Sequence, residues 1–144
     1  MSGSRRTPVT LAVVLGLSVS LAACGTQKSP TEPTDAPDSR ATFTRVQAEI
    51  FTPSCALSGC HAGANPQQGM DLGAGRSYAQ IVNVRSVEST RFRIAPGDTA
   101  GSYLLSKVAG DATITGVRMP PGGALTADQL TLLADWIRRG APND

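Results

Sequence analysis

Aromatic residues are scarce in this chain of 144 residues, making up 4% of it, with one Trp, two Tyr and three Phe. A domain of this size with so few large side chains has a thin protein-only core, which excludes a large aromatic interior and a second core. Small domains compensate with a disulfide, a metal or a buried cofactor. Few residues could hold such a group, because the chain contains one His, three Cys and three Met.

The chain also lacks an excess of charge of one sign. Lys and Arg number 13 against 11 acidic residues. Two of the basic residues, Arg5 and Arg6, lie in a segment that we expect to be removed, which leaves equal numbers. Nucleic-acid binding through bulk positive charge is therefore not expected.

The N-terminal apolar run, residues 9–23, is too short for a membrane-spanning helix. With Arg5 and Arg6 before it, the run is typical of an export signal. It ends in Leu21-Ala22-Ala23-Cys24, which resembles the lipobox of bacterial lipoproteins. We predict a lipoprotein signal peptide over residues 1–23 and a lipid carried by the sulfur of Cys24. The alternative is a plain secretory signal that leaves Cys24 as a free thiol.

Residues 24–41 contain Thr, Ser, Pro, Asp and Glu with almost no apolar side chain. Such a segment cannot bury enough surface to fold, so we predict a lipidated, disordered linker followed by one domain over residues 42–144. We expect the cell envelope as location, facing the periplasm or the cell surface. An aspartate directly after the lipidated cysteine is associated with retention in the inner membrane. This chain has Gly25 at that position, which favours the outer membrane in a host with two membranes.

The two remaining cysteines and the only histidine stand together in Cys55-Ala56-Leu57-Ser58-Gly59-Cys60-His61. A haem attached through thioethers needs two thiols near its vinyl groups and an imidazole beside the second thiol. C-x-x-C-H is the known attachment signature, and here four residues separate the cysteines. Longer C-x-x-x-x-C-H sites are known in multihaem cytochromes of the c3 type, and Ser58-Gly59 would let the longer loop bulge.

Two other interpretations of these residues stay open. A disulfide between Cys55 and Cys60 suits an oxidising compartment but leaves His61 without a role. Zinc could bind Cys55, Cys60 and His61, although no further Cys or His would complete a closed structural site.

Haem iron in a stable electron carrier needs a second axial ligand, and no second histidine exists. Met119 lies in a rigid loop, Arg118-Met119-Pro120-Pro121-Gly122-Gly123, which can present a thioether at fixed geometry. Met70 follows His61 too closely to reach the opposite haem face, and we interpret it as a gap-filling apolar residue. We predict His61 and Met119 as the iron ligands.

Capping boxes predict the starts of two helices. Thr44 with Gln47 opens a helix that leads to the cysteine loop. Thr126 with Gln129 opens a C-terminal amphipathic helix that stops at Gly140.

Between these helices the patterns are shorter. Residues 75–82 predict a brief helix, and Asp98 is expected to cap another that ends at Gly110. Residues 90–94 alternate in polarity but have no visible partner, so we predict an extended loop.

This order of helix, cysteine-histidine loop, short helices, methionine loop and C-terminal helix resembles the class I cytochrome c fold over residues 43–142. It is most similar to the small c-type cytochrome modules of bacterial surface lipoproteins, on the matching pieces Gly75-Arg76-Ser77-Tyr78, Pro96-Gly97-Asp98, Ser102-Tyr103-Leu104, Met119-Pro120 and Trp136-Ile137.

The resemblance implies an all-α domain wrapped around one covalent haem c. It assigns Cys55 and Cys60 to the thioethers, His61 to the proximal position and Met119 to the distal position. The implied function is electron transfer with redox protein partners, without an enzymatic reaction. A five-coordinate haem sensor remains open if Met119 does not bind iron, as does a cofactor-free envelope lipoprotein with a Cys55–Cys60 disulfide.

The surroundings of the haem can also be anticipated. We expect Leu130, Leu133 and Ile137 to bury it, which would raise its potential. Arg76 or Arg118 is expected near the propionates.

Overall fold

The computed structural model describes residues 36–144. The predicted signal peptide over residues 1–23, the lipidation site Cys24 and most of the linker over residues 24–41 lie outside this part. Ala41, the last residue of the predicted linker, is 1% exposed and belongs to the core, so the packed domain includes at least one residue before position 42. Within the described residues no helix combines the length and apolarity needed to cross a membrane.

The regular structure of residues 36–144 consists of short helical elements, and β-pairing in this part is limited to isolated bridges. In chain order these elements are α1 (Phe43–Val46), the π-helical turn η1 (Gln47–Phe51), α2 (Thr52–Ser54), the 3-10 turn η2 (Gln67–Gly69), α3 (Ser77–Ile81), α4 (Tyr103–Ala109) and α5 (Ala127–Arg138).

The first three elements form one continuous helical run whose N-cap lies two residues earlier than predicted. Thr42 is the N-cap, and its hydroxyl accepts a hydrogen bond from the Arg45 N–H. The predicted capping box of Thr44 with Gln47 is therefore wrong. The Gln47 amide instead donates to the Leu72 carbonyl at 3.0 Å and its oxygen accepts from the Ser77 hydroxyl. Gln47 thus ties the N-terminal helix to the segment before α3.

The C-terminal helix α5 follows the sequence prediction. The Thr126 hydroxyl accepts from the Gln129 N–H at 3.2 Å, and the Gln129 side chain accepts from the Thr126 N–H at 2.9 Å. One face of the helix is buried, including Leu133, Trp136 and Ile137. Its amphipathic pattern and its capping box are local signals, which is why the sequence predicts it well.

The central helices are shorter than predicted or start elsewhere. α3 covers only Ser77–Ile81 of the predicted residues 75–82. The N-cap of α4 is Ser102, not Asp98, whose carboxylate instead accepts from the Gly101 N–H at 2.8 Å in the preceding turn. α4 ends at Gly110 as expected, with a left-handed backbone at φ 81°.

Residues 90–94 form a loop with bends at residues 90, 91 and 93 and do not form a sheet. Phe92 bridges to Arg85 and Ser102, and Ile94 bridges to Val82. These single bridges hold the long connection between α3 and α4 against both helices.

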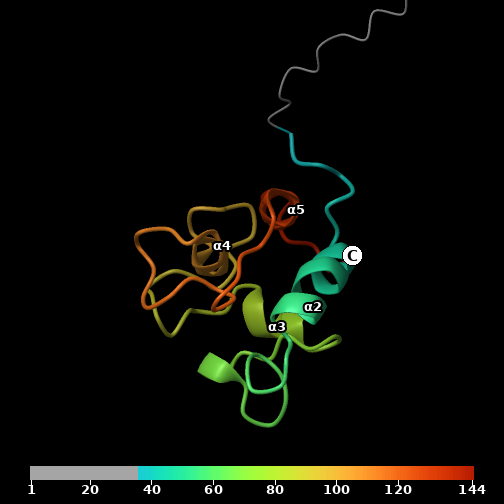
Figure 1. Ribbon diagram of the computed structural model, residues 1–144. Coiled ribbons are helices and arrows are strands. Elements are labelled where there is room, and N and C mark those ends of the chain that lie inside the picture. The colour runs from blue at the N-terminus through green and yellow to red at the C-terminus, as the bar shows by residue number, and fades with distance from the viewer. Residues whose placement is uncertain (1–35) are drawn as a thin grey trace, which may run out of the picture. The chain divides into compact units, whose positions relative to one another are not determined.

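An aromatic cluster joins the two ends of the domain. The Phe43 ring lies 5.4 Å from Trp136 and 5.1 Å from Tyr78 between ring centroids. Trp136 is fully buried, and its indole N–H donates to the Pro142 carbonyl at 2.8 Å. The Phe43 N–H donates to the Asp144 side chain, so the C-terminus lies beside α1 (Figure 1). These aromatic contacts therefore stabilise the junction of α1 and α5.

Candidate functional site

The N-terminal helical run ends by placing Cys55 in the interior. The Cys55 N–H still donates to the Phe51 carbonyl at 2.9 Å, while its φ of −125° leaves the helix. The residue is 9% exposed. Burial, with a smaller contribution from nearby Cys60, raises the pKa of the Cys55 thiol to about 11. Cys55 and Cys60 are both free thiols in the structure, without a disulfide between them.

The loop between the cysteines folds back on itself. Gly59 has φ 78°, a left-handed conformation that suits glycine, as the sequence predicted for a bulge. The Cys60 N–H donates to the Leu57 carbonyl at 3.0 Å, and the His61 N–H donates to the Cys55 carbonyl at 3.2 Å. These two bonds bring Cys60 and His61 back beside Cys55 despite the four intervening residues.

Hydrogen bonding fixes the orientation of the His61 ring. Its Nδ1 lies 3.2 Å from the Gln67 carbonyl oxygen and 3.3 Å from the Met70 carbonyl oxygen. Because a carbonyl only accepts, Nδ1 carries the proton, and in the neutral imidazole Nε2 keeps its lone pair. Metal-binding histidines are typically held this way, with the second ring nitrogen donating to a carbonyl. Nε2 is the available ligand atom.

Met119 comes from the far end of the chain and reaches the same place. Its N–H donates to the Lys107 carbonyl at 3.0 Å, which anchors the methionine loop to α4. The Met119–Pro120 peptide bond is cis. Met119 is half-buried and packs on the core.

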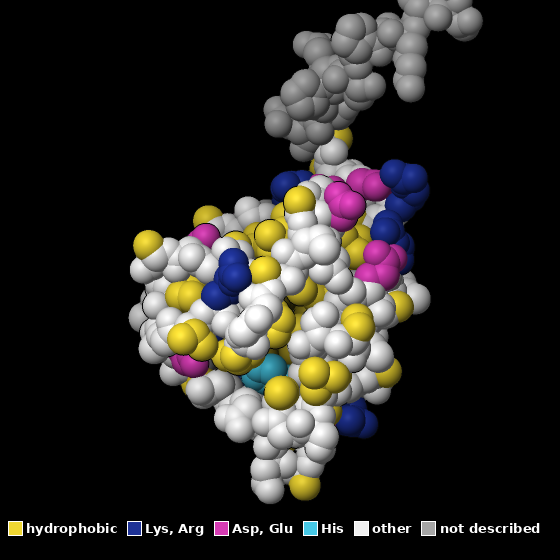
Figure 2. Space-filling model, in the orientation of Figure 1, with side chains coloured by type: hydrophobic (Ala, Val, Ile, Leu, Met, Phe, Trp, Pro, Cys, Tyr) yellow, Lys and Arg dark blue, Asp and Glu magenta, His cyan; other side chains and the backbone are white. Residues whose placement is uncertain are grey.

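One cavity of about 440 Å³ unites these residues. Cys55, Cys60, His61 and Met119, the four predicted site residues, all line it. Figure 2 shows the histidine within a hollow bordered by apolar side chains. The volume lies within the range of about 300–1,000 Å³ that is usual for cofactor and ligand sites.

The apolar wall differs from the predicted one. It includes Phe51, Leu72, Leu104 and Val108 together with Met70. The α5 residues Leu130, Leu133 and Ile137 do not line the cavity but pack in the core. The N-terminal run, the segment before α3 and α4 supply the wall, whereas α5 packs against α1 and α4.

Met70 lines the same cavity as Met119 but is held differently. Its own carbonyl oxygen accepts from the His61 ring, so its backbone lies on the Nδ1 side of the imidazole. A ligand opposite His61 must approach from the side that Nε2 faces. Both methionines line the cavity, and Met119 remains the predicted ligand for that position.

A polar group closes another part of the cavity. Glu88 accepts from Lys107 at 2.8 Å and from the Tyr103 hydroxyl at 3.0 Å, and its second oxygen accepts from the Gln68 amide at 3.2 Å. Burial opposes ionisation of Glu88, but these hydrogen bonds and the Lys107 charge outweigh it and hold the pKa of the carboxyl below its ordinary value. Glu88 is therefore ionised and paired at neutral pH.

Sequence reasoning missed the arginine of this cavity. Arg93 lines it and is 8% exposed. Arg76, one of the two predicted arginines, pairs with Asp71 at the surface, and Arg118 donates to the Gly123 carbonyl; neither lines the cavity. The alternation of residues 90–94 does not reveal it, because Arg93 stands between the apolar residues Phe92 and Ile94 and yet is buried together with Ile94.

The donor set does not form a compact site for a metal ion. Among residues 36–144 no three His, Cys, Asp or Glu side chains lie close enough to hold one. The same side chains instead line a larger cavity of about 440 Å³. Comparisons with known proteins gave no match among family models, curated proteins or solved structures.

Proposed function

We propose that this protein is an electron carrier with one covalently attached haem c, in a small helical domain of the cytochrome c type. One observation carries the proposal: two free thiols, an imidazole with Nε2 available and a methionine line one largely apolar cavity. Two separate parts of the chain, the loop of residues 55–61 and the loop that contains Met119, supply these groups. The thin protein core gives a large apolar cofactor a structural role as well.

Each site residue has a defined task in this proposal. Cys55 and Cys60 would form thioether bonds by addition of each S–H across a vinyl group. His61 would bind iron through Nε2, with Nδ1 held by the Gln67 and Met70 carbonyls. Met119 would supply the thioether on the other side. When bound, the haem iron alternates between ferrous and ferric and so holds one electron.

The surroundings of these ligands favour transfer of electrons over chemistry at the iron. With His61 and Met119 both bound, no coordination position is left for a substrate, so we propose no enzymatic activity. Methionine opposite histidine raises the reduction potential. The buried side chains of Phe51, Leu72 and Leu104 line the cavity and would favour the less charged, reduced form of a bound haem.

The proposed location rests on residues outside the described part. A lipid on Cys24 would anchor the carrier to a membrane of the cell envelope, with the outer membrane favoured in a host with two membranes. The proline-containing linker would let the domain reach redox protein partners while staying attached.

Covalent attachment is the decisive test. The full chain is expressed together with haem-ligation machinery, and haem is sought by staining after denaturing electrophoresis and by intact mass. We expect one haem per chain in the wild type, a single thioether in Cys55→Ser and in Cys60→Ser, and no covalent haem in the double variant. Met70→Ala serves as a control from the same cavity that retains covalent haem.

The outcomes separate the remaining alternatives. A wild-type chain without haem, two hydrogens lighter than expected for free thiols, would establish the Cys55–Cys60 disulfide of a cofactor-free lipoprotein. Rapid binding of carbon monoxide by the reduced wild-type protein would identify a five-coordinate sensor. Covalent haem without such binding supports the electron carrier.

A further inference from the structure

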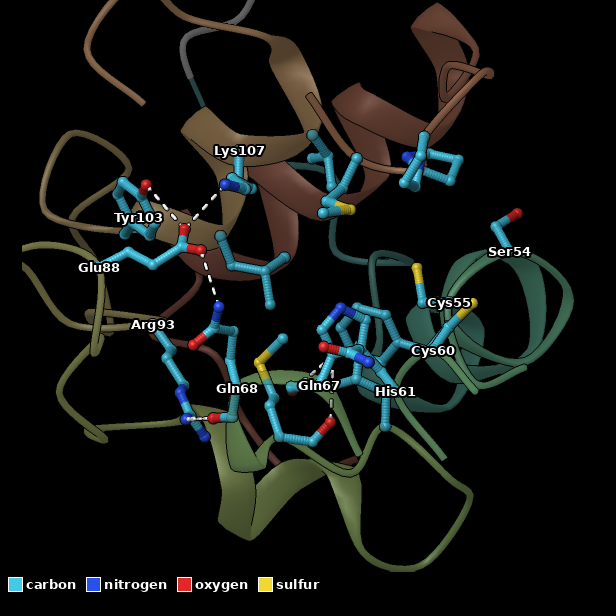
Figure 3. A pocket seen from close by; sticks show the side chains of 18 of the residues that line it. Ser54, Cys55, Cys60, His61, Gln67, Gln68, Glu88, Arg93, Tyr103 and Lys107 are labelled. Atoms are coloured by element: carbon cyan, nitrogen blue, oxygen red, sulfur yellow. Dashed lines mark hydrogen bonds and ion pairs between the residues drawn. The ribbon is translucent and has the colours of Figure 1, made fainter. Parts of the chain in front are cut away.

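The cavity has two chemically different ends. Cys55 and Cys60 lie at one end, and Arg93, Glu88 and Lys107 lie at the other (Figure 3). The end with the cysteines carries no formal charge, whereas all charged side chains named here gather at the opposite end.

Arg93 is the unbalanced charge at that end. It is 8% exposed, and within residues 36–144 no carboxylate lies within ion-pair distance of it. Its guanidinium donates to the Gln80 and Gln68 carbonyls, both at 2.8 Å. These bonds use two of its five N–H groups. Burial without a counter-charge lowers the pKa of the Arg93 guanidinium, which reflects the free-energy cost of keeping this cation in the interior.

The neighbouring charges do not provide compensation. Lys107 and Glu88 form an ion pair at 2.8 Å and cancel each other. The Tyr103 hydroxyl and the Gln68 amide both donate to Glu88, which satisfies its two oxygens. This end of the cavity therefore has a net positive charge that comes from Arg93.

A haem carries its two vinyl groups and its two propionates on opposite edges. If the vinyl edge is bound at Cys55 and Cys60, the propionate edge is directed toward the other end of the cavity. We propose that Arg93 binds a haem propionate, supplying the charge-assisted hydrogen bonds for which arginine and carboxylate are matched. This inference rests on the proposed function and adds to it the residue that orients the haem within the cavity.

The test compares holoproteins of the full chain: wild type, Arg93→Gln, Arg93→Lys and the control Arg85→Gln. Arg85 stacks over the Phe92 ring at 4.2 Å and does not line the cavity. The midpoint potential is measured between about pH 5 and pH 8, the range in which a buried carboxylic acid without its cation titrates.

We expect the wild-type potential to be almost independent of pH, because Arg93 keeps the propionate ionised and Glu88 is held ionised by Lys107 and Tyr103. Arg93→Gln should lower the potential, since loss of a nearby positive charge disfavours the added electron. The same variant should make the potential fall with rising pH, because the propionate now binds a proton on reduction. Arg93→Lys should restore most of both properties, and Arg85→Gln should leave both unchanged.

Equal potentials and equal pH profiles in Arg93→Gln and Arg85→Gln, with haem attached in both, would overturn the inference and leave the electron carrier standing. A wild-type chain without covalent haem would overturn both proposals. Should Arg93→Gln fail to mature, the wild type itself decides, because a pH-dependent potential in this range contradicts a propionate held ionised by Arg93.

Discussion

Replacing Met119 by alanine tests the sixth ligand directly. Truncation of a fully buried methionine costs about 2–5 kcal/mol of folding free energy. Met119 is half-buried, so the loss of packing should be about half of that, or about 1–2.5 kcal/mol. A domain stability of about 5–15 kcal/mol leaves this variant folded. Changes at the iron in Met119→Ala can therefore be attributed to ligation.

The assay is optical spectroscopy of the reduced holoprotein with and without carbon monoxide. Wild type should not bind carbon monoxide rapidly, because both axial positions are filled. Met119→Ala should bind it at once and show a lower midpoint potential, since the methionine ligand that favours the ferrous state is lost. Thermal unfolding of the same samples verifies the small packing cost.

Met70→Ala is the matched control, because Met70 is also half-buried and lines the same cavity. It should keep the wild-type spectrum and remain unreactive toward carbon monoxide. The reasoning is refuted if Met70→Ala opens the iron and Met119→Ala does not. Such a result would mean that the chain passes round the porphyrin within the short segment after His61.

Three further predictions concern the domain itself. In protein prepared without haem, the free energy of unfolding should fall by about 2–3 kcal/mol as the pH rises from 9 to about 11. The cause is the raised pKa of the buried Cys55 thiol, which makes the unfolded chain lose this proton at a lower pH than the folded chain. Chemical denaturation of Cys55→Ser should not show this loss. Trp136→Phe should lower the free energy of unfolding by about 1–3 kcal/mol, because it leaves the Pro142 carbonyl without its donor; an unchanged urea midpoint would contradict this. Thr126→Ala should cost about 1 kcal/mol by removing the hydroxyl that accepts from the Gln129 N–H, which the same denaturation measurement detects.

The sequence predicted best those features whose causes are local. α5 could be anticipated because its cap and its apolar stripe are contained in residues 126–137. The start of the first helix could not, because Gln47 serves a contact with Leu72 and Ser77, far along the chain, instead of the cap at Thr44. A capping box in a sequence competes with every tertiary partner that the same side chain can find.

The candidate site shows the same division. Cys55, Cys60 and His61 are adjacent in sequence, so their common purpose is visible there, and Met119 follows from the scarcity of other ligands. Arg93 gave no comparable signal, because its importance comes from what is missing around it: the structure buries the guanidinium among carbonyl groups without a carboxylate.

The polar end of the cavity connects the long segment between α3 and α4 to α4 itself. Glu88 and Arg93 come from the segment between α3 and α4, while Lys107 lies on α4 and donates to Glu88 across the cavity rim. Lys107 also accepts the Met119 N–H through its backbone carbonyl. One residue therefore links the proposed propionate end to the proposed iron ligand.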